Sequence, residues 1–299
     1  MSTADRISGS TDVALSFLER LERFAATNVS VDPATLRLEL LRWLRTEQSD
    51  QPSMALIHQL CGRALDIAGT GVARADSASA VRSSLLASCI SERDDLAASR
   101  AAIARIAGKL VTRRGAWIAT LSHSRIVLEA IAELARQGQS PHAIVAESRP
   151  LFEGRRAAAE LAGLGVPVWL VADAALPLLL SQASVIWLGA DAVTDRGVVN
   201  KIGSYAIALA ARECSVPVYA LAGQRKFLPA ATAALRILPM PPAEIWDAPP
   251  DGVETRNVYF EMVPLELLRG VVNEDVVLGP TEAAQLARER ELPGELQGG

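Results

Sequence analysis

The spacing of hydrophobic residues changes partway along the chain. Between residues 12 and 106, apolar side chains recur every three or four positions. In the segment LSFLERLERFAA, for example, Leu15, Leu18 and Leu21 share one face of a helix. Short polar loops separate several such segments. This pattern predicts an N-terminal domain of amphipathic helices that ends near Gly108.

After Gly108, short apolar runs rich in β-branched residues alternate with helical segments. The runs are WIATL, AIVAES, VPVWLVA, VIWLGA and VPVYALAG, which begin at residues 117, 143, 166, 185 and 216. Nearly continuous apolar strands that alternate with helices are typical of a parallel sheet covered on both faces. We therefore predict an α/β protein with a helical domain (residues 1–108), followed by a Rossmann-like, mostly parallel, doubly wound sheet domain (residues 109–299).

Two segments near the C-terminus do not fit this alternation. The stretch LPMPPAEIWDAPPDG, residues 238–252, is rich in proline and predicts an extended surface loop rather than a further element. The tail after Pro280 has a charged helical pattern and ends in LPGELQGG. We expect that end of the tail to be frayed.

Composition narrows the possible functions. Half of the 299 residues are hydrophobic and the net charge is −4, so we do not expect nucleic acid binding through bulk electrostatics. The chain lacks a pattern typical of a secretory signal or a membrane span. The three cysteines, Cys61, Cys89 and Cys214, are too scattered to indicate a zinc site or a disulfide framework. We expect a cytoplasmic protein with neither a metal nor another cofactor.

Polar residues follow each predicted strand. The sequence SHSR follows the first strand, ESRP the second, Asp173 the third, Asp191 the fourth and GQRK the fifth. In a doubly wound sheet, ligands bind at the carboxyl ends of the strands, where loops and helix N-termini meet. These groups suit phosphate binding, hydroxyl binding or proton transfer, so the sequence predicts a site for a phosphorylated ligand.

Three long motifs carry a family resemblance. The run GADAVTDRGVVNKIGSYAIALAA, with AESRPLFEGRRAAAEL before it and NVYFEMVPLELLRGVVNEDVVLGP after it, resembles the translation initiation factor 2B regulatory subunits. That superfamily also includes isomerases of methylthioribose 1-phosphate and ribose 1,5-bisphosphate. The segment QPSMALIHQL is similar to the proline-containing segment of the family's helical domain, so the resemblance covers roughly residues 50 to 280.

The resemblance implies roles for individual residues. In the isomerases the aspartate of the GAD motif is the catalytic acid or base, which here is Asp191. The resemblance also implies a substrate-binding set. Its members come from the NK pair, a basic residue after the following strand, the ESRP element and a position that is often glutamine in the isomerases: Asn200, Lys201, Lys226, Arg149 and Glu153.

Elementary chemistry supports these roles separately. A cleft that excludes water raises the pKa of a carboxyl such as Asp191 toward the range useful for moving a proton between carbons. The cations Lys201, Lys226 and Arg149 can neutralise phosphate charge. Gly203 lets the backbone approach an anion closely at the start of a helix whose amides point toward it.

The sequence also departs from the isomerase pattern. Ser122 stands at the position of the isomerase cysteine, and a serine hydroxyl needs an activating base to replace a thiolate. His123 is adjacent and is a candidate for that help and for substrate binding. The RGA phosphate-binding motif of the isomerases is not found in residues 1–110, and Gln51 stands where they often have arginine. These differences favour a ligand-binding site over a full isomerase, and the missing RGA motif favours one phosphate over two.

Each candidate also has a purely structural explanation. Asp191 could cap the turn formed by DAVTDRG, and Asn200 could be the N-cap of a helix that starts near residue 202. Arg149 could pair with the glutamate at position 147 or 153, and Lys226 could be a solvated loop charge.

Two functions therefore remain open. The first is a factor 2B-related protein that binds a sugar phosphate or a nucleoside monophosphate in a regulatory role. The alternative is an active aldose–ketose isomerase that uses Asp191 as its acid or base. The resemblance implies a homodimer formed through the Rossmann-like half, and we expect the segment VYFEMVPLELL to be exposed there. A protein partner is possible, whereas we expect neither membrane nor direct nucleic acid contact.

Overall fold

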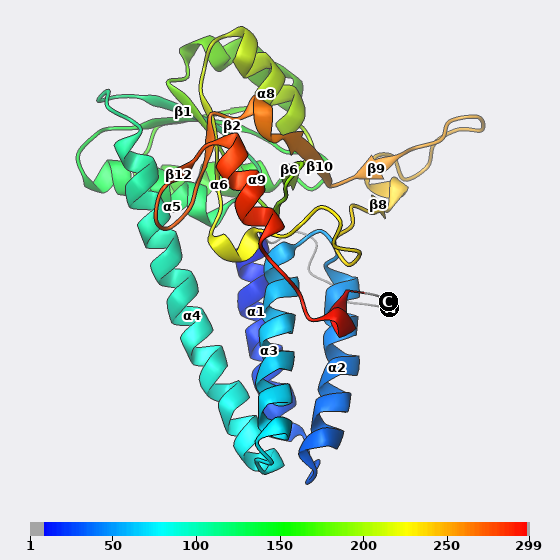
Figure 1. Ribbon diagram of the computed structural model, residues 1–299. Coiled ribbons are helices and arrows are strands. Elements are labelled where there is room, and N and C mark those ends of the chain that lie inside the picture. Colours follow the sequence, from blue (N-terminus) through cyan, green and yellow to red (C-terminus); the bar gives the residue numbers. More distant parts are fainter. Residues whose placement is uncertain (1–8, 298–299) are drawn as a thin grey trace.

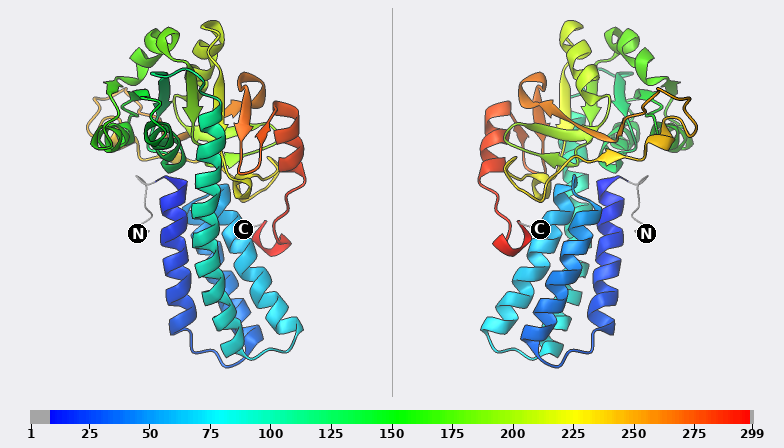
Figure 2. Two further views of the ribbon diagram at one scale, coloured as in Figure 1. Left: turned by 90° about the vertical axis from the view of Figure 1, so that its left-hand side faces the viewer. Right: turned by 90° about the vertical axis from the view of Figure 1, so that its right-hand side faces the viewer.

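The computed structural model describes residues 9–297 and shows a helical bundle that stands against one side of an α/β unit (Figures 1 and 2). The bundle helices are α1 (Ser10–Thr27), α2 (Pro33–Asp50), α3 (Ala55–Ala73) and α4 (Ala78–Lys109). Helix α2 begins where the sequence supplies the signals for it. The side chain of Asp32 accepts a hydrogen bond from the Thr35 amide (2.8 Å), and Pro33 occupies the first turn.

Helix α4 extends from the bundle to the sheet. Its N-terminal part contributes Val81 and Leu85 to the core of the bundle. Its C-terminal part contributes Ile103 and Ala107 to the apolar layer that covers one face of the sheet. One continuous helix therefore joins the two halves and ends at Lys109. The division into domains at residue 108 stays a prediction, and both outer ends of the predicted domains lie outside the described residues.

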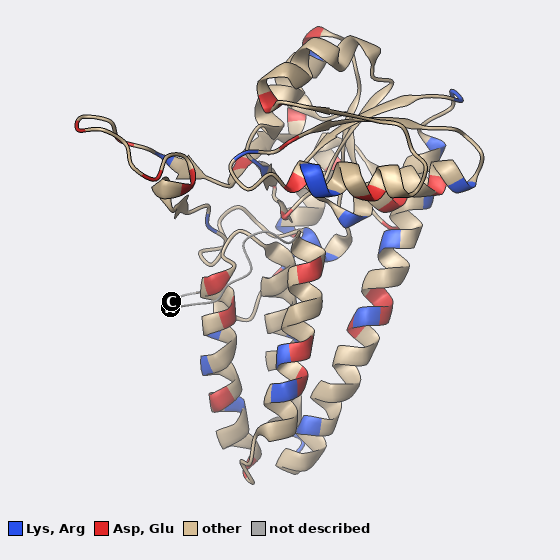
Figure 3. Ribbon diagram, turned by 180° about the vertical axis from the view of Figure 1, so that it is seen from behind, with Lys and Arg blue, Asp and Glu red and all other residues tan. Residues whose placement is uncertain are grey.

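The outer surfaces of the bundle helices are polar and mixed in charge. Acidic and basic residues are interspersed along them (Figure 3). Within residues 9–297, no helix is both long enough and apolar enough to cross a bilayer.

The main sheet has seven strands in the order β12-β11-β7-β4-β1-β2-β3. All neighbouring pairs are parallel except β11 and β12. The strands are β1 (Trp117–Leu121), β2 (His142–Ala146), β3 (Val168–Val171), β4 (Val185–Leu188), β7 (Val218–Leu221), β11 (Gly270–Val272) and β12 (Val277–Leu278). The chain runs outward from β1 to β3 and then returns to place β4 on the other side of β1. The predicted doubly wound α/β fold is confirmed.

Helices cover both faces of this sheet because side chains alternate along each strand. Ile118 of β1 points to the face covered by α4, α5 (Arg125–Arg136) and α6 (Glu153–Gly163). Ala119 points to the opposite face, which is covered by α7 (Leu176–Leu179), α8 (Ser204–Glu213) and α9 (Pro280–Arg288). The near-continuous apolar character of the predicted strands follows from this double burial.

A smaller antiparallel sheet, in the order β10-β6-β5, lies beside the carboxyl ends of the main strands. Its strands are β5 (Ala192–Val193), β6 (Gly197–Lys201) and β10 (Phe260–Pro264). Asn200 and Lys201 therefore end a strand instead of opening a helix. The next helix, α8, starts at Ser204.

The structure corrects two predictions about the C-terminal region. Most of the proline-rich stretch is exposed, as expected for a surface loop, but it includes β8 (Pro239–Met240), which pairs with β9 (Asn257–Val258) in a projecting arm. The tail is anchored as far as it is described, up to residue 297, because Leu292 and Leu296 are buried and Leu296 belongs to the core of the bundle. Residues 298–299 lie outside the described residues. The apolar side chain at position 296 gains more by packing than it would by remaining in water.

The segment VYFEMVPLELL is exposed only in part, whereas we expected it to be exposed. Val263 and Leu265 belong to the core on the α8 face of the sheet, while Val258 and Met262 keep more than a third of their surface exposed. Strand pairing explains the difference, since β10 joins β6 and turns alternate side chains inward.

Gly154→Ala should destabilise the fold because α6 presses directly against the end of β2. An added Cβ at Gly154 would lie 1.8 Å from the carbonyl oxygen of Ala146, so backbone would have to move. We expect the free energy of unfolding to fall by about 2 kcal/mol, measured by chemical denaturation. Gly163→Ala, in the same helix, meets no atom within 4 Å and should be neutral or slightly stabilising. Equal stability of the two variants would contradict this packing.

Candidate functional site

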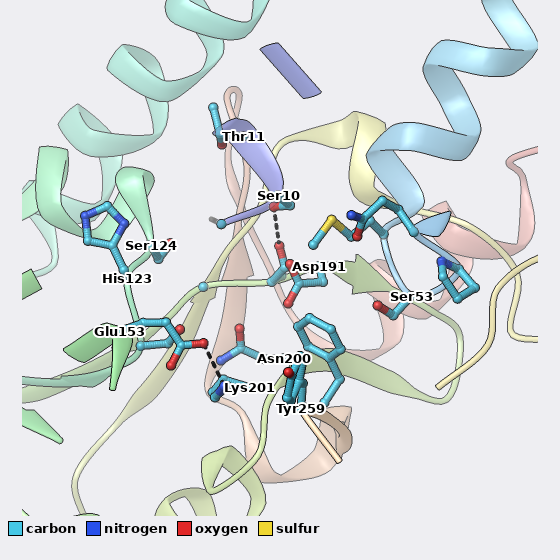
Figure 4. A pocket seen from close by; sticks show the side chains of 18 of the residues that line it. Ser10, Thr11, Ser53, His123, Ser124, Glu153, Asp191, Asn200, Lys201 and Tyr259 are labelled. Atoms are coloured by element: carbon cyan, nitrogen blue, oxygen red, sulfur yellow. Dashed lines mark hydrogen bonds and ion pairs between the residues drawn. The ribbon is translucent and has the colours of Figure 1, made fainter. Parts of the chain in front are cut away.

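A cavity of about 420 Å³ opens where the strand order reverses, between the ends of β1 and β4 (Figure 4). This is the position at which doubly wound sheets bind ligands, and the volume suits a small metabolite. Seven of the eight predicted site residues line the cavity: Ser122, His123, Glu153, Asp191, Asn200, Lys201 and Lys226. Whether each performs its predicted role stays a prediction.

Asp191 is fixed by its backbone to both halves of the chain. Its amide donates to the carbonyl of Val199 (2.8 Å), and its carbonyl accepts from the amide of Ala55 at the start of α3 (2.9 Å). The side chain accepts a hydrogen bond from Ser10 (Figure 4). The following turn is capped by Thr194 instead, whose hydroxyl bonds Gly197. The Asp191 side chain therefore points into the cavity and does not cap the turn.

Burial dominates the ionisation of this carboxyl. It raises the pKa of Asp191 to about 6, although the nearby Lys226 and Lys201 ammonium groups favour the charged form and the Ser10 hydrogen bond acts in the same direction. The Glu153 carboxylate adds to the increase. A carboxyl that titrates near neutral pH is able to give or take a proton.

Lys226 is a buried cation rather than a solvated loop charge. Its residue is only 7% exposed, and its Nζ donates to the Ser10 hydroxyl (2.8 Å) and to the Ala190 carbonyl (2.6 Å). Burial lowers the pKa of Lys226, and the Asp191 carboxylate opposes that change. The lysine is carried by a 3₁₀ turn, η3 (Gln224–Lys226), directly after β7.

Lys201 forms a buried ion pair in the cavity. Its Nζ lies 2.7 Å from Glu153 Oε1, and both side chains are at least nine-tenths buried. The same ammonium lies 4.9 Å from the centroid of the Tyr259 ring. The Tyr259 hydroxyl donates to the carboxylate of Glu244 on the arm (2.5 Å). The arm thus helps to fix the ring beneath Lys201.

Asn200 and the start of α8 are connected through Ser204. The Asn200 amide donates to the Ser204 hydroxyl (2.9 Å), so Asn200 is not the N-cap of α8. Gly203 is the N-cap and has φ +102°, a conformation that favours glycine. The carboxylate of Glu261 accepts from the amides of Gly203 (2.7 Å) and Tyr205 (2.9 Å). These amides were expected to face a bound anion, but an internal carboxylate already occupies them.

The N-terminus of α1 borders the cavity, which the sequence analysis did not foresee. Gly9, Ser10 and Thr11 line it, and Gly9 as the N-cap has no side chain to accept hydrogen bonds from the first turn. A Cβ at Gly9 would lie 2.8 Å from the His123 carbonyl oxygen, so a larger residue would force these segments apart. The only sequence signal was a small residue directly before an amphipathic segment.

Other lining residues also come from segments that were not singled out. The loop before α3 contributes Ser53 and Met54, and the base of the arm contributes Leu238 to Pro241. Tyr259 lines the cavity as well. Within residues 9–297, no group of three or more His, Cys, Asp or Glu side chains is arranged to hold a metal ion.

Ser122 and His123 do not form an activated pair. Ser122 has φ +63°, and its amide donates to the Ser148 hydroxyl (2.6 Å). His123 Nε2 lies 2.9 Å from Glu160 Oε2 on α6, so the ring is engaged on that side. Among the described residues no hydrogen bond joins the Ser122 hydroxyl to the imidazole. The geometry thus gives Ser122 no general base.

Arg149 is the predicted site residue that lies outside the cavity lining. Its amide donates to the carboxylate of Asp173 (2.7 Å), and its guanidinium reaches the carbonyl of Ile245 (3.4 Å). The glutamates considered as its salt-bridge partners pair with Arg155 and Lys201 instead. A contact between Arg149 and a ligand stays a prediction.

The chain is similar to proteins of two kinds. It is 35% identical over 170 residues to a translation initiation factor eIF-2B subunit 2-like protein of Pyrococcus abyssi, covering 56% of this chain and 60% of that protein. It is 31% identical over 205 residues to ribose 1,5-bisphosphate isomerase of Pyrococcus furiosus, covering 64% of this chain and 62% of the isomerase. The aligned part thus spans about 60% of the length of these relatives.

A solved structure and a protein family are similar to this chain over more of its length. The crystal structure of the translation initiation factor eIF-2B of Pyrococcus horikoshii OT3 superimposes with a TM-score of 0.78 at 26% identity, covering 92% of this chain and 93% of that one. The conserved pattern of the initiation factor 2 subunit family matches residues 6–280. Since this match includes both the bundle and the sheet, the chain belongs to the initiation factor 2 subunit family, IF-2B.

Proposed function

We propose that this chain binds a phosphorylated sugar or a nucleoside monophosphate in the cavity of about 420 Å³, called the first cavity below, and has a regulatory role. The observation that carries the proposal is the convergence of two buried ammonium groups, a carboxyl and an amide on one enclosed space of metabolite size: Lys201, Lys226, Asp191 and Asn200. Burying a charged side chain costs free energy, and several such side chains around one cavity are typical of a ligand site.

The charges indicate how a ligand would be oriented. Lys201 is neutralised by Glu153, whose Oε1 lies 2.7 Å from its Nζ. The Asp191 carboxyl interacts with both lysines, and Lys226 also lies beside the first turn of α1. A phosphate therefore gains most near Lys226, where the positive end of α1 adds to the ammonium. The opposite end, near Asn200 and Tyr259, supplies groups suited to hydroxyls or a base. This arrangement supports recognition of one phosphate.

The environment of Ser122 favours binding without turnover. A serine nucleophile or acid needs a partner that moves its proton, and His123 is turned toward Glu160. Relatives named as subunits of factor eIF-2B and relatives named as isomerases both exist, so similarity alone does not separate the two roles.

One observation favours the second candidate, an aldose–ketose isomerase. The pKa of Asp191 is raised to about 6, which suits a residue that shuttles a proton between adjacent carbons. In that case Asp191 would act alone or with a water molecule in place of the isomerase cysteine. Asp191→Asn would then abolish turnover and leave ligand binding nearly intact.

We also propose that the chain forms a homodimer through its sheet domain. Helix α8 and strand β10 contact each other and expose apolar side chains, Tyr205 and Met262, with Val258 of the arm nearby in sequence. Exposed apolar groups on adjacent elements are typical of interfaces.

Ligand binding should be detectable by thermal shift. Hexose 6-phosphates, ribose 1,5-bisphosphate, methylthioribose 1-phosphate and nucleoside monophosphates form the test set, with proton NMR on each hit to detect conversion of aldose to ketose. We expect at least one monophosphate to raise the melting temperature without turnover. Turnover of a hit would favour the isomerase instead, and no stabilisation by any compound would contradict both candidates.

Lys226→Met should weaken binding of the identified phosphate compound by about tenfold or more, because a charge-assisted hydrogen bond is lost. Isothermal titration measures the change. Lys109→Met is the matched control, since Lys109 is exposed at the end of α4 and lies outside the cavity lining. Equal affinities of the two variants would place the phosphate elsewhere.

The pH dependence of stability should report on Asp191. Its folded pKa of about 6 lies above the ordinary value of 3.8, so the folded state holds a proton that the unfolded chain has lost between these values. Stability should therefore fall by about 2 kcal/mol as pH rises from 4 to 6.5. Denaturation of the wild type and of Asp191→Asn across this range isolates the effect. A constant difference between the two proteins would show that the carboxyl titrates normally.

The proposed dimer predicts a mass in solution of about twice 31.8 kDa by light scattering. Met262→Asp should shift the protein toward the monomer, because a charge would be buried in the interface. Val29→Asp is the control, since Val29 is 89% exposed in the loop between α1 and α2. A monomeric wild type, or equal masses of the two variants, would exclude this interface.

A further inference from the structure

A second cleft, of about 470 Å³, lies on the other side of Lys226 from the first cavity. One wall is the face of α4 that carries Leu96, Ser99 and Arg100, and the facing wall is the loop Gly223–Lys226 with the turn after β11. Thr11 and Lys226 line both spaces. This cleft therefore touches the bundle helix, the sheet domain and the wall of the first cavity together.

The charged groups of the cleft are not equally engaged. Its three carboxylates all hold partners within the protein: Asp95 pairs with Arg225 (2.8 Å), Glu274 accepts from the Gln224 amide (2.9 Å), and Asp275 accepts from the Gln224 side chain (2.5 Å). These contacts hold the loop in place, but only Asp95 is neutralised by a cation, because the donors to Glu274 and Asp275 are uncharged amides.

The arginines of α4 are less occupied. Arg100 donates through Nε to Glu129 (2.9 Å) and through Nη1 to the Leu96 carbonyl (3.3 Å). Arg105 donates only to the Ala101 carbonyl of its own helix (3.3 Å), and no ion pair holds it within the described residues. Because a guanidinium has five donors, both arginines retain hydrogen-bonding capacity toward the cleft. The free N–H donors belong to positively charged guanidinium groups, so they suit an anion.

We propose that this cleft binds a small anion bearing a phosphate or carboxylate group, held by Arg100 and Arg105, and that the bound anion stabilises the loop that carries Lys226. This second site is distinct from the first cavity, and the proposal does not rest on the identity of the ligand in the first cavity. Loop Gly223–Lys226 is the physical connection: Arg225 ties it to α4, while Lys226 reaches Ser10 and Ala190 in the first cavity. An anion between α4 and this loop would hold the two at a fixed distance, so the two sites would be coupled.

The site can be tested directly with tungstate, an anion of phosphate geometry that gives an anomalous signal. Crystals of the full chain soaked in tungstate should show a peak within hydrogen-bonding distance of Arg100 and Arg105. Arg105→Gln crystals should show that peak weakened or lost, while Lys109→Gln crystals should retain it, because Lys109 lines neither space. Peaks confined to the first cavity or to other surfaces would overturn the proposal.

Solution measurements test the coupling. Titration with orthophosphate should show two binding events in the wild type, and the Arg100→Gln/Arg105→Gln variant should lose one of them or weaken it by about tenfold. Hydrogen exchange of amides 223–228 should slow on addition of orthophosphate in the wild type and slow less in this variant. Arg105→Gln alone guards against misfolding, since the residue is exposed and makes only one local contact. Identical phosphate titrations and identical exchange in wild type and double variant would refute the second site.

Discussion

The architecture of the first cavity depends on the need to neutralise two buried ammonium groups. Lys201 and Lys226 are each less than a tenth exposed, and an unpaired ion at such a depth would cost several kcal/mol. Glu153 compensates the first and Asp191 the second, and Lys226 also donates to the Ser10 hydroxyl and the Ala190 carbonyl. Each carboxylate comes from a different element, so the site exists only when the loops after three strands and the start of α1 are assembled.

The sequence predicted site residues best where their place at the end of a strand decides where they lie. Asp191, Asn200, Lys201 and Lys226 follow predicted strands, and the parallel sheet brings strand ends together whatever the details of packing. Ser10 was not foreseen because its partner Lys226 is 216 positions away, and nothing in the spacing of residues encodes that contact. The strands of the main sheet were recognisable from double burial, which gives long apolar runs. Two-residue strands such as β5 and β8 carry no such periodicity.

Glu261 illustrates a further limit of sequence reasoning. A glycine before a helix predicts exposed amides that suit an anion, and this holds for the start of α1 but not for α8. Strand pairing sets Glu261 opposite Asn200, which brings its carboxylate to the first turn of α8. The protein thus supplies its own anion at one helix terminus and leaves the other bordering the cavity. This asymmetry follows from the register of β6 and β10, which the sequence pattern did not reveal.

The connection between bundle and sheet gives the helical domain a direct influence on the site. Glu92 of α4 is 2% exposed and pairs with both Arg63 of α3 and Arg225, the neighbour of Lys226. Burial raises the pKa of Glu92, and the two arginines oppose that change, so the carboxylate depends on both for its charge. A shift of the bundle that separated α4 from η3 would remove Arg225, one of the two ion-pair partners of this buried carboxylate, and would move Lys226 at the same time. The cost of that separation resists relative motion of the two halves, and it makes the position of the bundle part of the ligand site rather than a passive support.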